Sequence, residues 1–301
     1  MAEFIYLNGN LIPRSKGRIS PFDHGFLYGY GLFETMRAYN GHIFRLDCHL
    51  ARLLCSIESL GLAHSVIASL SSVIASEAKQ SLETACMETL KANKLKDARL
   101  RLTITAGEGE MTPDPGTCSN PTVLVTAREL TPLPPEKYEQ GFKTVLSPLR
   151  RDSHSPLSRL KSTCYLNSIL AKMEVKANGY DEAILLNEQG QLAEGSTSNI
   201  FLLIQGILIT PSLESGVLPG ITREAVIEIA RALDIKVEER KVELKELTKA
   251  EEAFLTNSIM EIMPLTWFAD EPIGTGKAAL LTMSLMSAYK ELVNKTLNKI
   301  A

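Results

Sequence analysis

Three short segments of the chain carry residue types that bind phosphate, hold a charge and supply an amine. The loop Leu218–Gly220 ends where a helical pattern begins at Ile221. The unpaired backbone N–H groups at the start of a helix bind phosphate, and Thr222 adds a hydroxyl at this place. Threonine is also a common helix cap, so Thr222 by itself is open to both interpretations.

The other two segments supply an acid and a lysine. Glu194 precedes the small polar residues up to Asn199, between two apolar stretches, which is also the composition of a plain turn. Lys161 follows Arg159 ahead of a helix, and a cationic neighbour lowers the pKa of a lysine towards that of a nucleophilic amine. Most single lysines are solvated surface charges instead. Taken together, a phosphate-binding helix start, a carboxylate and a reactive lysine are the parts that a pyridoxal phosphate enzyme needs.

Seven segments with these features in them resemble, in order, the motifs of class IV aminotransferases, the fold type IV pyridoxal phosphate enzymes. They are Ser20–Gly29, Phe33–Arg37, His49–Leu53, Leu160–Asn167, Glu194–Asn199, Gly220–Arg223 and Leu255–Ser258. The resemblance covers nearly the whole chain. It implies an α+β fold of two domains, similar to D-amino acid aminotransferase, with the cofactor in the interdomain cleft. It further implies a homodimer in which each partner lends residues to the other's site.

The resemblance also implies roles for individual residues. Lys161 is expected to carry the cofactor as a Schiff base, and Glu194 to face the pyridine nitrogen. Tyr165 is expected to contact the ring hydroxyl, although it follows Lys161 one residue sooner than in branched-chain enzymes. The remaining cofactor-binding residues implied in this way, mainly around the phosphate, are Arg52, Ser198, Asn199, Ile221, Thr222, Thr256 and Asn257. A guanidinium and helix-start amides suit a phosphate dianion.

Two positions separate the reactions of the family. Branched-chain enzymes typically have Phe-Glu-Gly where this chain has Phe33-Glu34-Thr35, and a Gly-Thr-Ala turn where it has Thr256-Asn257-Ser258. A threonine at position 35 resembles aminodeoxychorismate lyase, in which a hydroxyl helps to protonate the leaving enolpyruvyl oxygen. The sequence therefore favours, through this resemblance, a lyase of folate synthesis that releases para-aminobenzoate and pyruvate. The alternative is a D-amino acid or branched-chain transaminase that transfers an amino group to 2-oxoglutarate.

Substrate-binding residues are expected on a strand of the first domain. Arg101 lies about where the family has a cationic carboxylate binder, and alternation along a strand puts Arg99 on the same face. Two solvated arginines on an open sheet face would have the same pattern. The resemblance adds Tyr28 and Phe33 to the substrate-binding residues. Neither reaction is excluded, since the substrates of both carry carboxylates, and the preference for D or L substrates stays open.

Composition excludes several other classes of protein. The 301 residues are 45% hydrophobic and 22% charged, with a net charge of -3 and no long basic run, so nucleic acid and anionic membranes are not expected partners. No apolar run is long enough for a membrane span, and the first residues lack the pattern of a signal peptide, which predicts a cytoplasmic protein. Five isolated cysteines and five scattered histidines predict neither a disulfide framework nor a metal site.

The hydrophobic pattern and the prolines that interrupt it suggest where the two domains divide. Strand-like segments and two helical stretches, the second ending near Lys94, fill residues 1–129, and Pro132, Pro134 and Pro135 place an interdomain linker at 130–137. Residues 138–301 are then the larger, cofactor-binding domain. Its predicted helices are Tyr165–Ala177, with Leu166, Ile169, Leu170 and Met173 on one face, Thr222–Leu233 and Lys277–Val293. A duplicated Ser-Val-Ile-Ala-Ser segment at 65–76 has no assigned role.

Overall fold

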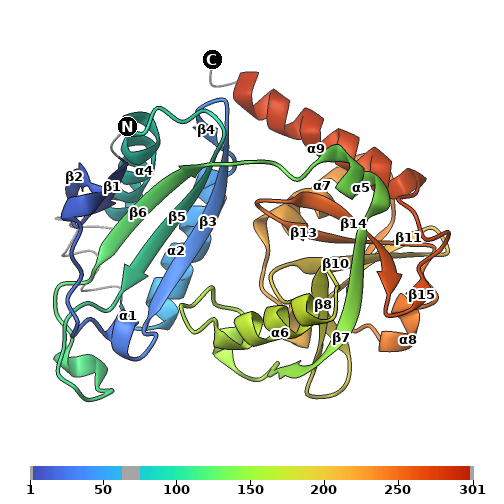
Figure 1. Ribbon diagram of the computed structural model, residues 1–301, viewed down its shortest axis with the longest axis horizontal. Helices are drawn as coiled ribbons and strands as arrows, with labels where there is room; N and C mark the ends of the chain where they lie inside the picture. Colours follow the sequence, from blue (N-terminus) through green and yellow to red (C-terminus); the bar gives the residue numbers. More distant parts are fainter. Residues whose placement is uncertain (1–2, 63–74, 299–301) are drawn as a thin grey trace. The chain divides into compact units, whose positions relative to one another are not determined.

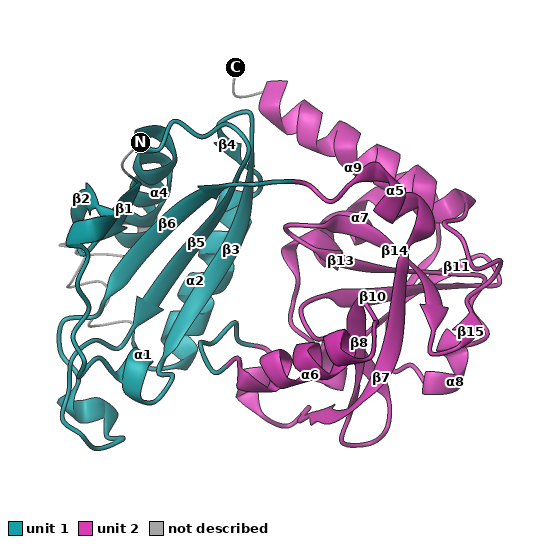
Figure 2. Ribbon diagram, viewed as in Figure 1, with its two compact units in different colours: residues 1–131, 160–164, 299–301 teal, residues 132–159, 165–298 magenta. Residues whose placement is uncertain are grey.

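The computed structural model describes residues 3–62 and 75–298, in two compact units (Figure 1; Figure 2). The first unit contains the described residues up to Thr131 together with Leu160–Cys164. The second contains Pro132–Arg159 and Tyr165–Asn298. The duplicated segment at 65–76 lies almost wholly outside the described residues.

A six-stranded antiparallel sheet forms the first unit, in the order β2-β1-β6-β5-β3-β4. Asn40 and Gly41 both have positive φ, 47° and 85°, in the turn between β3 and β4, which confirms the hairpin predicted there. The strands are β1 (Phe4–Leu7), β2 (Asn10–Pro13), β3 (Gly31–Tyr39), β4 (His42–Ile43), β5 (Ala98–Thr105) and β6 (Val123–Glu129). The helices of this unit are α1 (His24–Leu27), α2 (Leu46–Ser59) and α4 (Ala75–Ala92).

The two faces of this sheet differ in chemistry. Along β5, Leu100 and Leu102 are fully buried in a core that includes residues of α2 and α4. Arg99 and Arg101 alternate with them and therefore lie on the opposite face, as the alternation predicts. The apolar face holds the unit together, and the other face carries polar and basic side chains.

The segment with Lys161 belongs to the first unit, although the sequence placed it in the domain 138–301. The Lys161 carbonyl accepts a hydrogen bond from the Phe33 amide (2.8 Å), and the Thr163 amide donates to the Gly31 carbonyl (2.9 Å). β4 pairs only with the far end of β3, at Ala38 and Tyr39. The start of β3 therefore has an open edge, and Lys161–Thr163 satisfies its backbone groups.

The second unit is built on a nine-stranded sheet in the order β12-β11-β10-β13-β14-β7-β8-β9, with β15 beside β14. Its strands are β7 (Phe142–Arg151), β8 (Glu182–Asn187), β9 (Leu192–Gly195), β10 (Asn199–Ile204), β11 (Ile207–Pro211), β12 (Val237–Arg240), β13 (Glu252–Asn257), β14 (Glu261–Phe268) and β15 (Glu271–Pro272). Its helices are α5 (Pro135–Gln140), α6 (Leu166–Ala177), α7 (Ile221–Ala232), α8 (Leu244–Leu247) and α9 (Leu280–Asn298). Parallel pairings of β7 with β8 and β14, and of β11 with β12, make this sheet mixed.

Two details differ from the sequence prediction. The predicted linker 130–137 runs into α5, because a proline is well placed in the first turn of a helix, where its missing N–H has no partner to lose. In α6, Ala171 and Val175 are the buried residues. The apolar face predicted for this helix is exposed, with Leu166 65% and Met173 62% accessible.

Candidate active site

The start of α7 has the backbone geometry expected of an anion site. Gly220 is the N-cap, and no side chain caps the helix, so the interpretation of Thr222 as the cap is wrong. A Cβ on Gly220 would lie 1.9 Å from the Asn199 side-chain oxygen, which only glycine avoids. Ile221 and Thr222 are buried in the first turn. The amides of a first turn have no acceptor within their own helix, so those of α7 suit an anionic ligand.

Glu194 is a buried carboxylate held on several sides within the second unit. Its Oε1 pairs with Arg151 Nη2 at 2.9 Å. Its Oε2 accepts hydrogen bonds from the Leu218 amide (3.0 Å) and from Asn199 Nδ2 (3.3 Å). The arginine partner and the amide favour the ionised carboxylate. An ionised acid is what the nitrogen of a protonated pyridine ring requires.

Arg151, which the sequence did not single out, is the cationic partner of Glu194. It ends β7, and besides Glu194 its guanidinium donates to the carbonyls of Ser158 (2.6 Å) and Gly216 (3.1 Å). Nothing in its local sequence pairs it with Glu194, because the two residues are 43 positions apart. Its contacts fix the position of the Glu194 carboxylate.

Tyr165 belongs to the same electrostatic environment. Burial raises the pKa of its phenol, the nearby Glu194 raises it further, and Arg151 partly opposes both effects. The hydroxyl therefore stays protonated at neutral pH and is able to donate a hydrogen bond. This suits the contact with a ring oxygen predicted for Tyr165.

Two buried hydroxyls of the second unit have no hydrogen-bond partner among the described residues. They are Ser198 Oγ and Thr256 Oγ1, in side chains that are 6% and 1% accessible. Thr256 on β13 pairs directly with Asn199 on β10, whose side chain also contacts the loop before α7. Because an unpaired buried hydroxyl is costly, these two groups fit a ligand rich in acceptors, such as a phosphate.

Asn257 contributes to this region in another way. Its Oδ1 accepts from the Ile259 and Met260 amides, each at 2.9 Å, and its Nδ2 donates to the Thr197 carbonyl at 3.2 Å. The side chain therefore holds the turn between β13 and β14. Its role as a cofactor ligand stays a prediction.

In the first unit, Lys161 lies beside two other residues singled out from the sequence. Its Nζ is 4.6 Å from the centre of the Phe33 ring, and Arg101 Cζ is 3.7 Å from the same centre. Thr35 lies directly opposite Arg101 in the pairing of β3 and β5, so the two side chains share a face. Phe33, two residues before Thr35, is on that face too. Lys161, Phe33, Thr35 and Arg101 thus form one group.

Tyr28 and Arg99 are the other two substrate-binding residues predicted in this unit. Tyr28 follows α1 with its side chain 41% accessible, and its ring packs edge-on against His24 at 4.9 Å. Arg99 is exposed and lies opposite Arg37 of β3.

A second buried carboxylate, Glu34, sits at the centre of an ion cluster that the sequence did not reveal. It accepts from Arg52 through Nε (2.8 Å) and Nη2 (2.6 Å), and from His49 Nδ1 (2.7 Å). Burial opposes its charge, but the Arg52 guanidinium and the His49 hydrogen bond hold the pKa of Glu34 at about 2. Burial also disfavours the charged form of His49, and therefore lowers the pKa of this imidazole. Arg52, predicted as a phosphate ligand, is thereby oriented through two of its nitrogens.

Comparison with known proteins shows the family. The model of the family "Amino-transferase class IV" matches residues 31–267. This chain belongs to the class IV aminotransferase family. Members of the family use pyridoxal phosphate, which confirms the cofactor predicted from the sequence. The unpaired hydroxyls, the helix start and the buried acid of the second unit fit that group.

Relatives in the family carry two kinds of name. An aminodeoxychorismate lyase of Bacillus subtilis is 36% identical over 297 residues, 98% of this chain and 96% of the relative. A putative branched-chain-amino-acid aminotransferase of Methanocaldococcus jannaschii is 36% identical over 292 residues, 97% and 96% of the two chains. The expected similarity to a bacterial lyase is confirmed. The level of identity does not separate the two names.

Solved structures confirm the predicted fold class. The branched-chain amino acid aminotransferase of Escherichia coli superimposes with a TM-score of 0.88 at 28% identity, covering 97% of this chain and 95% of the other. The branched-chain aminotransferase of Thermoproteus uzoniensis with norvaline gives 0.86 at 33% identity, with the same coverage. The α+β architecture of fold type IV is therefore that of this chain.

The described residues lack a membrane-spanning helix and a metal-binding cluster. No helix in residues 3–62 and 75–298 is long and apolar enough to cross a membrane. Within the same ranges, no group of three or more His, Cys, Asp or Glu side chains is arranged to hold a metal ion.

Proposed function

We propose that this class IV enzyme is an aminodeoxychorismate lyase, which converts its substrate into para-aminobenzoate and pyruvate. The observation that carries the proposal is the position of Thr35. Its side chain shares a sheet face with Phe33, on whose ring Lys161 Nζ lies, and with Arg101. A hydroxyl is thus grouped with the amine and with a cation that suits a carboxylate. The relative named a lyase supports the same reaction.

The second unit supplies the groups proposed to hold the cofactor. When bound, pyridoxal phosphate supplies an electrophilic carbon for amines and a ring that takes up electrons. We assign its phosphate to the amides of Ile221 and Thr222 and to the hydroxyls of Ser198 and Thr256, all within this unit. Glu194 keeps a proton on the ring nitrogen. Tyr165 donates its hydrogen bond to the ring oxygen.

Two residues of the first unit move protons in the proposed reaction. With the cofactor bound, Lys161 Nζ would remove the proton from the substrate carbon that bears the amine. Thr35 donates its hydroxyl proton to the ether oxygen as the carbon–oxygen bond to the enolpyruvyl group breaks, and takes a replacement from the proton on Lys161 or from water. The ring left behind is aromatic, and the released enol becomes pyruvate.

Substitution of Thr35 tests the role of its hydroxyl. Valine keeps the shape and the strand preference of threonine but lacks the donor, so Thr35→Val should slow formation of para-aminobenzoate by roughly 10²–10⁴-fold, the range for a positioned acid–base group. Thr35→Ser, the matched control, should stay within about tenfold of wild type because it keeps the hydroxyl. Both rates are measured with enzymatically generated aminodeoxychorismate.

A transamination half-reaction with D-alanine gives the second readout for these variants. This half-reaction expels no enolpyruvyl group, so it should be changed less than about tenfold by Thr35→Val. Equal losses in the two reactions would mean that Thr35 shapes the site and donates no proton. A Thr35→Val enzyme with the lyase rate of wild type would remove the residue from the mechanism.

The second candidate function is transamination of amino acids. It is favoured by the names of the M. jannaschii and E. coli relatives and by the norvaline bound to the T. uzoniensis enzyme. The same residues serve it, apart from the proton donated by Thr35. Steady turnover of D-alanine or L-leucine with 2-oxoglutarate, without para-aminobenzoate from the lyase assay, would put this function first.

We also propose that the enzyme is a cytoplasmic homodimer. The five cysteines are all free thiols, which suits a reducing compartment. Exposed apolar side chains on one face of a helix support a protein contact, here that of α6 with Leu166, Ile169, Leu170 and Met173. Sedimentation should show a dimer for wild type and a monomer for the double variant Ile169→Asp, Met173→Asp. The control Lys176→Ala, at an exposed position of the same helix, should stay dimeric; a wild-type monomer would contradict the proposal.

A further inference from the structure

Glu182 is a buried acid of the second unit that has no role in the site described above. It is the first residue of β8, and it is 1% accessible. Its Oε1 accepts hydrogen bonds from the Ser196 hydroxyl and from the Ala183 amide (2.9 Å), and its Oε2 accepts from the Thr197 hydroxyl (3.0 Å). A buried carboxylate is costly unless its oxygens are hydrogen-bonded, and here each oxygen binds one hydroxyl of the same short segment.

That segment, Ser196–Ser198, is the tight turn that joins β9 to β10. The Gly195 amide donates to the Ser198 carbonyl at 2.6 Å across the turn. A Cβ on Gly195 would collide with Ser198 Oγ and would lie 3.3 Å from Glu182 Cγ. The Glu182 side chain and the Ser198 hydroxyl therefore flank the same backbone position, and a shift of the turn would move both.

The turn is tied down from two neighbouring elements. Glu182 holds it from β8, and Asn257 Nδ2 donates to the Thr197 carbonyl (3.2 Å) from the end of β13. Between these two ties lies Ser198 Oγ, one of the two buried hydroxyls that have no hydrogen-bond partner among the described residues. The turn thus fixes in place a hydroxyl that is free to bind a ligand.

The surroundings of Glu182 favour a charged carboxylate close to the cofactor-binding groups. Lys172 Nζ of α6 lies 3.4 Å from Glu182 Oε2 and donates to the Asp181 carbonyl at 2.7 Å. Glu182 is also, after burial and Glu194, the third influence that raises the pKa of the Tyr165 phenol. The acid therefore lies near Tyr165 as well as beside the turn.

We propose that Glu182 is a positioning residue for the cofactor phosphate: it holds the hydroxyls of Ser196 and Thr197 and thereby fixes the turn that presents the Ser198 hydroxyl. The inference rests on the proposed function in that it takes Ser198 as a phosphate ligand. Without the carboxylate, the two hydroxyls turn to other acceptors and the Ser198 hydroxyl loses its fixed position. Affinity for the phosphate then falls, while the groups proposed to bind the ring, Glu194 and Tyr165, still do so.

Two ligands that differ only in the phosphate test this role. Pyridoxine phosphate and pyridoxine share the ring of the cofactor but lack its aldehyde, so neither bonds covalently to a lysine. Each is titrated by calorimetry into the full-length chain from which the cofactor has been removed. Glu182→Gln and Ser198→Ala should each weaken pyridoxine phosphate about tenfold and pyridoxine less than about twofold. A merely structural role of Glu182 would weaken both ligands together.

Ser196→Ala approaches the same contact from the other side. It should produce a loss selective for the phosphate, and it tests the proposal even if Glu182→Gln does not fold. The double variant Glu182→Gln, Ser196→Ala should lose little more than Glu182→Gln alone, because substitutions within one hydrogen-bond network are not additive.

Glu252→Gln is the matched control for loss of a structural carboxylate. Glu252 binds the Thr282 hydroxyl and the amides of Leu281 and Thr282, at the start of α9. The substitution therefore removes a similar set of hydrogen bonds from the same unit, at a place away from the turn. It should leave the affinity for both ligands unchanged, even where it lowers the free energy of unfolding.

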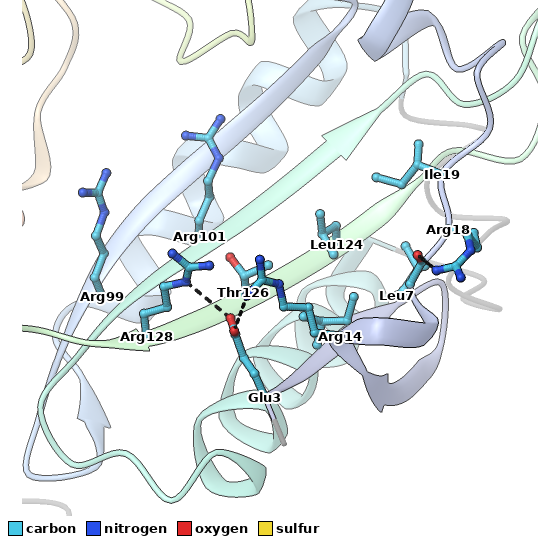
Figure 3. A pocket seen from close by; sticks show the side chains of 12 residues that line it. Glu3, Leu7, Arg14, Arg18, Ile19, Arg99, Arg101, Leu124, Thr126 and Arg128 are labelled. Atoms are coloured by element: carbon cyan, nitrogen blue, oxygen red, sulfur yellow. Dashed lines mark hydrogen bonds and ion pairs between the residues drawn. The ribbon is translucent and has the colours of Figure 1, made fainter. Parts of the chain in front are cut away.

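A second control concerns the first unit, where a phosphate has another place to bind. Five arginines and one acid, Glu3, are among the residues that line a pocket of about 580 Å³ on its basic sheet face (Figure 3). Arg128→Gln removes one of these charges. It should change neither affinity, and wild type should bind one pyridoxine phosphate per chain.

The possible failures are distinguishable. Equal losses for the two ligands in Glu182→Gln, additive losses in the double variant, or an equally large loss in Glu252→Gln or Arg128→Gln would overturn the proposal. A selective loss in Ser198→Ala but not in Glu182→Gln would overturn the role of Glu182 alone. No selective loss in Ser198→Ala would overturn both this role and the phosphate assignment. None of these outcomes depends on turnover, so failure of the lyase assay would leave them as they are.

Discussion

The two units hold their candidate residues in different ways. In the second unit, Glu194 is fixed by Arg151, and two buried hydroxyls, of Ser198 and Thr256, have no partner among the described residues. In the first unit, the cationic groups of Lys161 and Arg101 both contact the ring of Phe33, on the basic face of the sheet. In the proposed function, the second unit holds the cofactor, as any member of the family must. The first unit supplies the groups proposed to distinguish one substrate and reaction from another.

Substitution of Lys161 should have the largest effect, because this residue of the first unit is needed in both proposed reactions. Lys161→Ala should lower all activities by more than about 10³-fold, because the nucleophile and the proton acceptor are lost together. Borohydride reduction of wild-type holoenzyme should fix the cofactor on the peptide that contains Lys161. Lys176→Ala, at an exposed helical position, should behave as wild type. A cofactor fixed elsewhere, or a protein that takes up no pyridoxal phosphate, would contradict the assignment.

Substitution of Glu194 tests whether the second unit contributes equally to both reactions. A neutral amide stabilises a protonated ring poorly, and each 1.4 kcal/mol or so of lost stabilisation costs about tenfold in rate. Glu194→Gln should therefore keep the cofactor and lose about 10²–10³-fold in both the lyase reaction and the D-alanine half-reaction. Glu188→Gln, an acid of the same unit that binds Ser153, should keep its rate. A loss in only one reaction would undo the division of roles between the units.

Substitution of Glu34 should have the smallest effect of the three, and it should act on stability. Its pKa of about 2 lies below the ordinary 4.5, so its ion pairs stabilise the fold by on the order of 3 kcal/mol above pH 4.5, and this is lost as pH falls towards about 2. Glu34→Gln leaves Arg52 without its buried partner and should cost about 3–5 kcal/mol at neutral pH in urea unfolding. The difference from wild type should shrink towards about pH 3. Glu3→Gln, which breaks a more exposed pair, should cost at most about 1 kcal/mol.

Much of the fold was predictable from local pattern. The hairpin at Asn40-Gly41, strands β5 and β6 and helices α6 and α7 follow from turn chemistry and periodicity, which act over a few residues. The place of Lys161 in the first unit was not predictable in this way. It depends on the open edge of β3, more than a hundred residues away in the chain.

The same limit applies to the site. Lys161, Glu194 and the start of α7 were recognisable from residue type and resemblance. Arg151 and the cluster of Glu34, His49 and Arg52 are pairings between separate elements, and periodicity carries no information about them. The exposed face of α6 shows a related limit, because an apolar stripe on a helix is the same whether it meets the chain's own core or another protein.

The products formed from aminodeoxychorismate decide between the lyase reaction and transamination. Purified holoenzyme is incubated with aminodeoxychorismate made enzymatically, and separately with D-alanine or L-leucine plus 2-oxoglutarate, and all products are quantified. The proposed function predicts para-aminobenzoate and pyruvate in equal amounts, at a rate well above that of either transamination. Robust transamination with no para-aminobenzoate would contradict it.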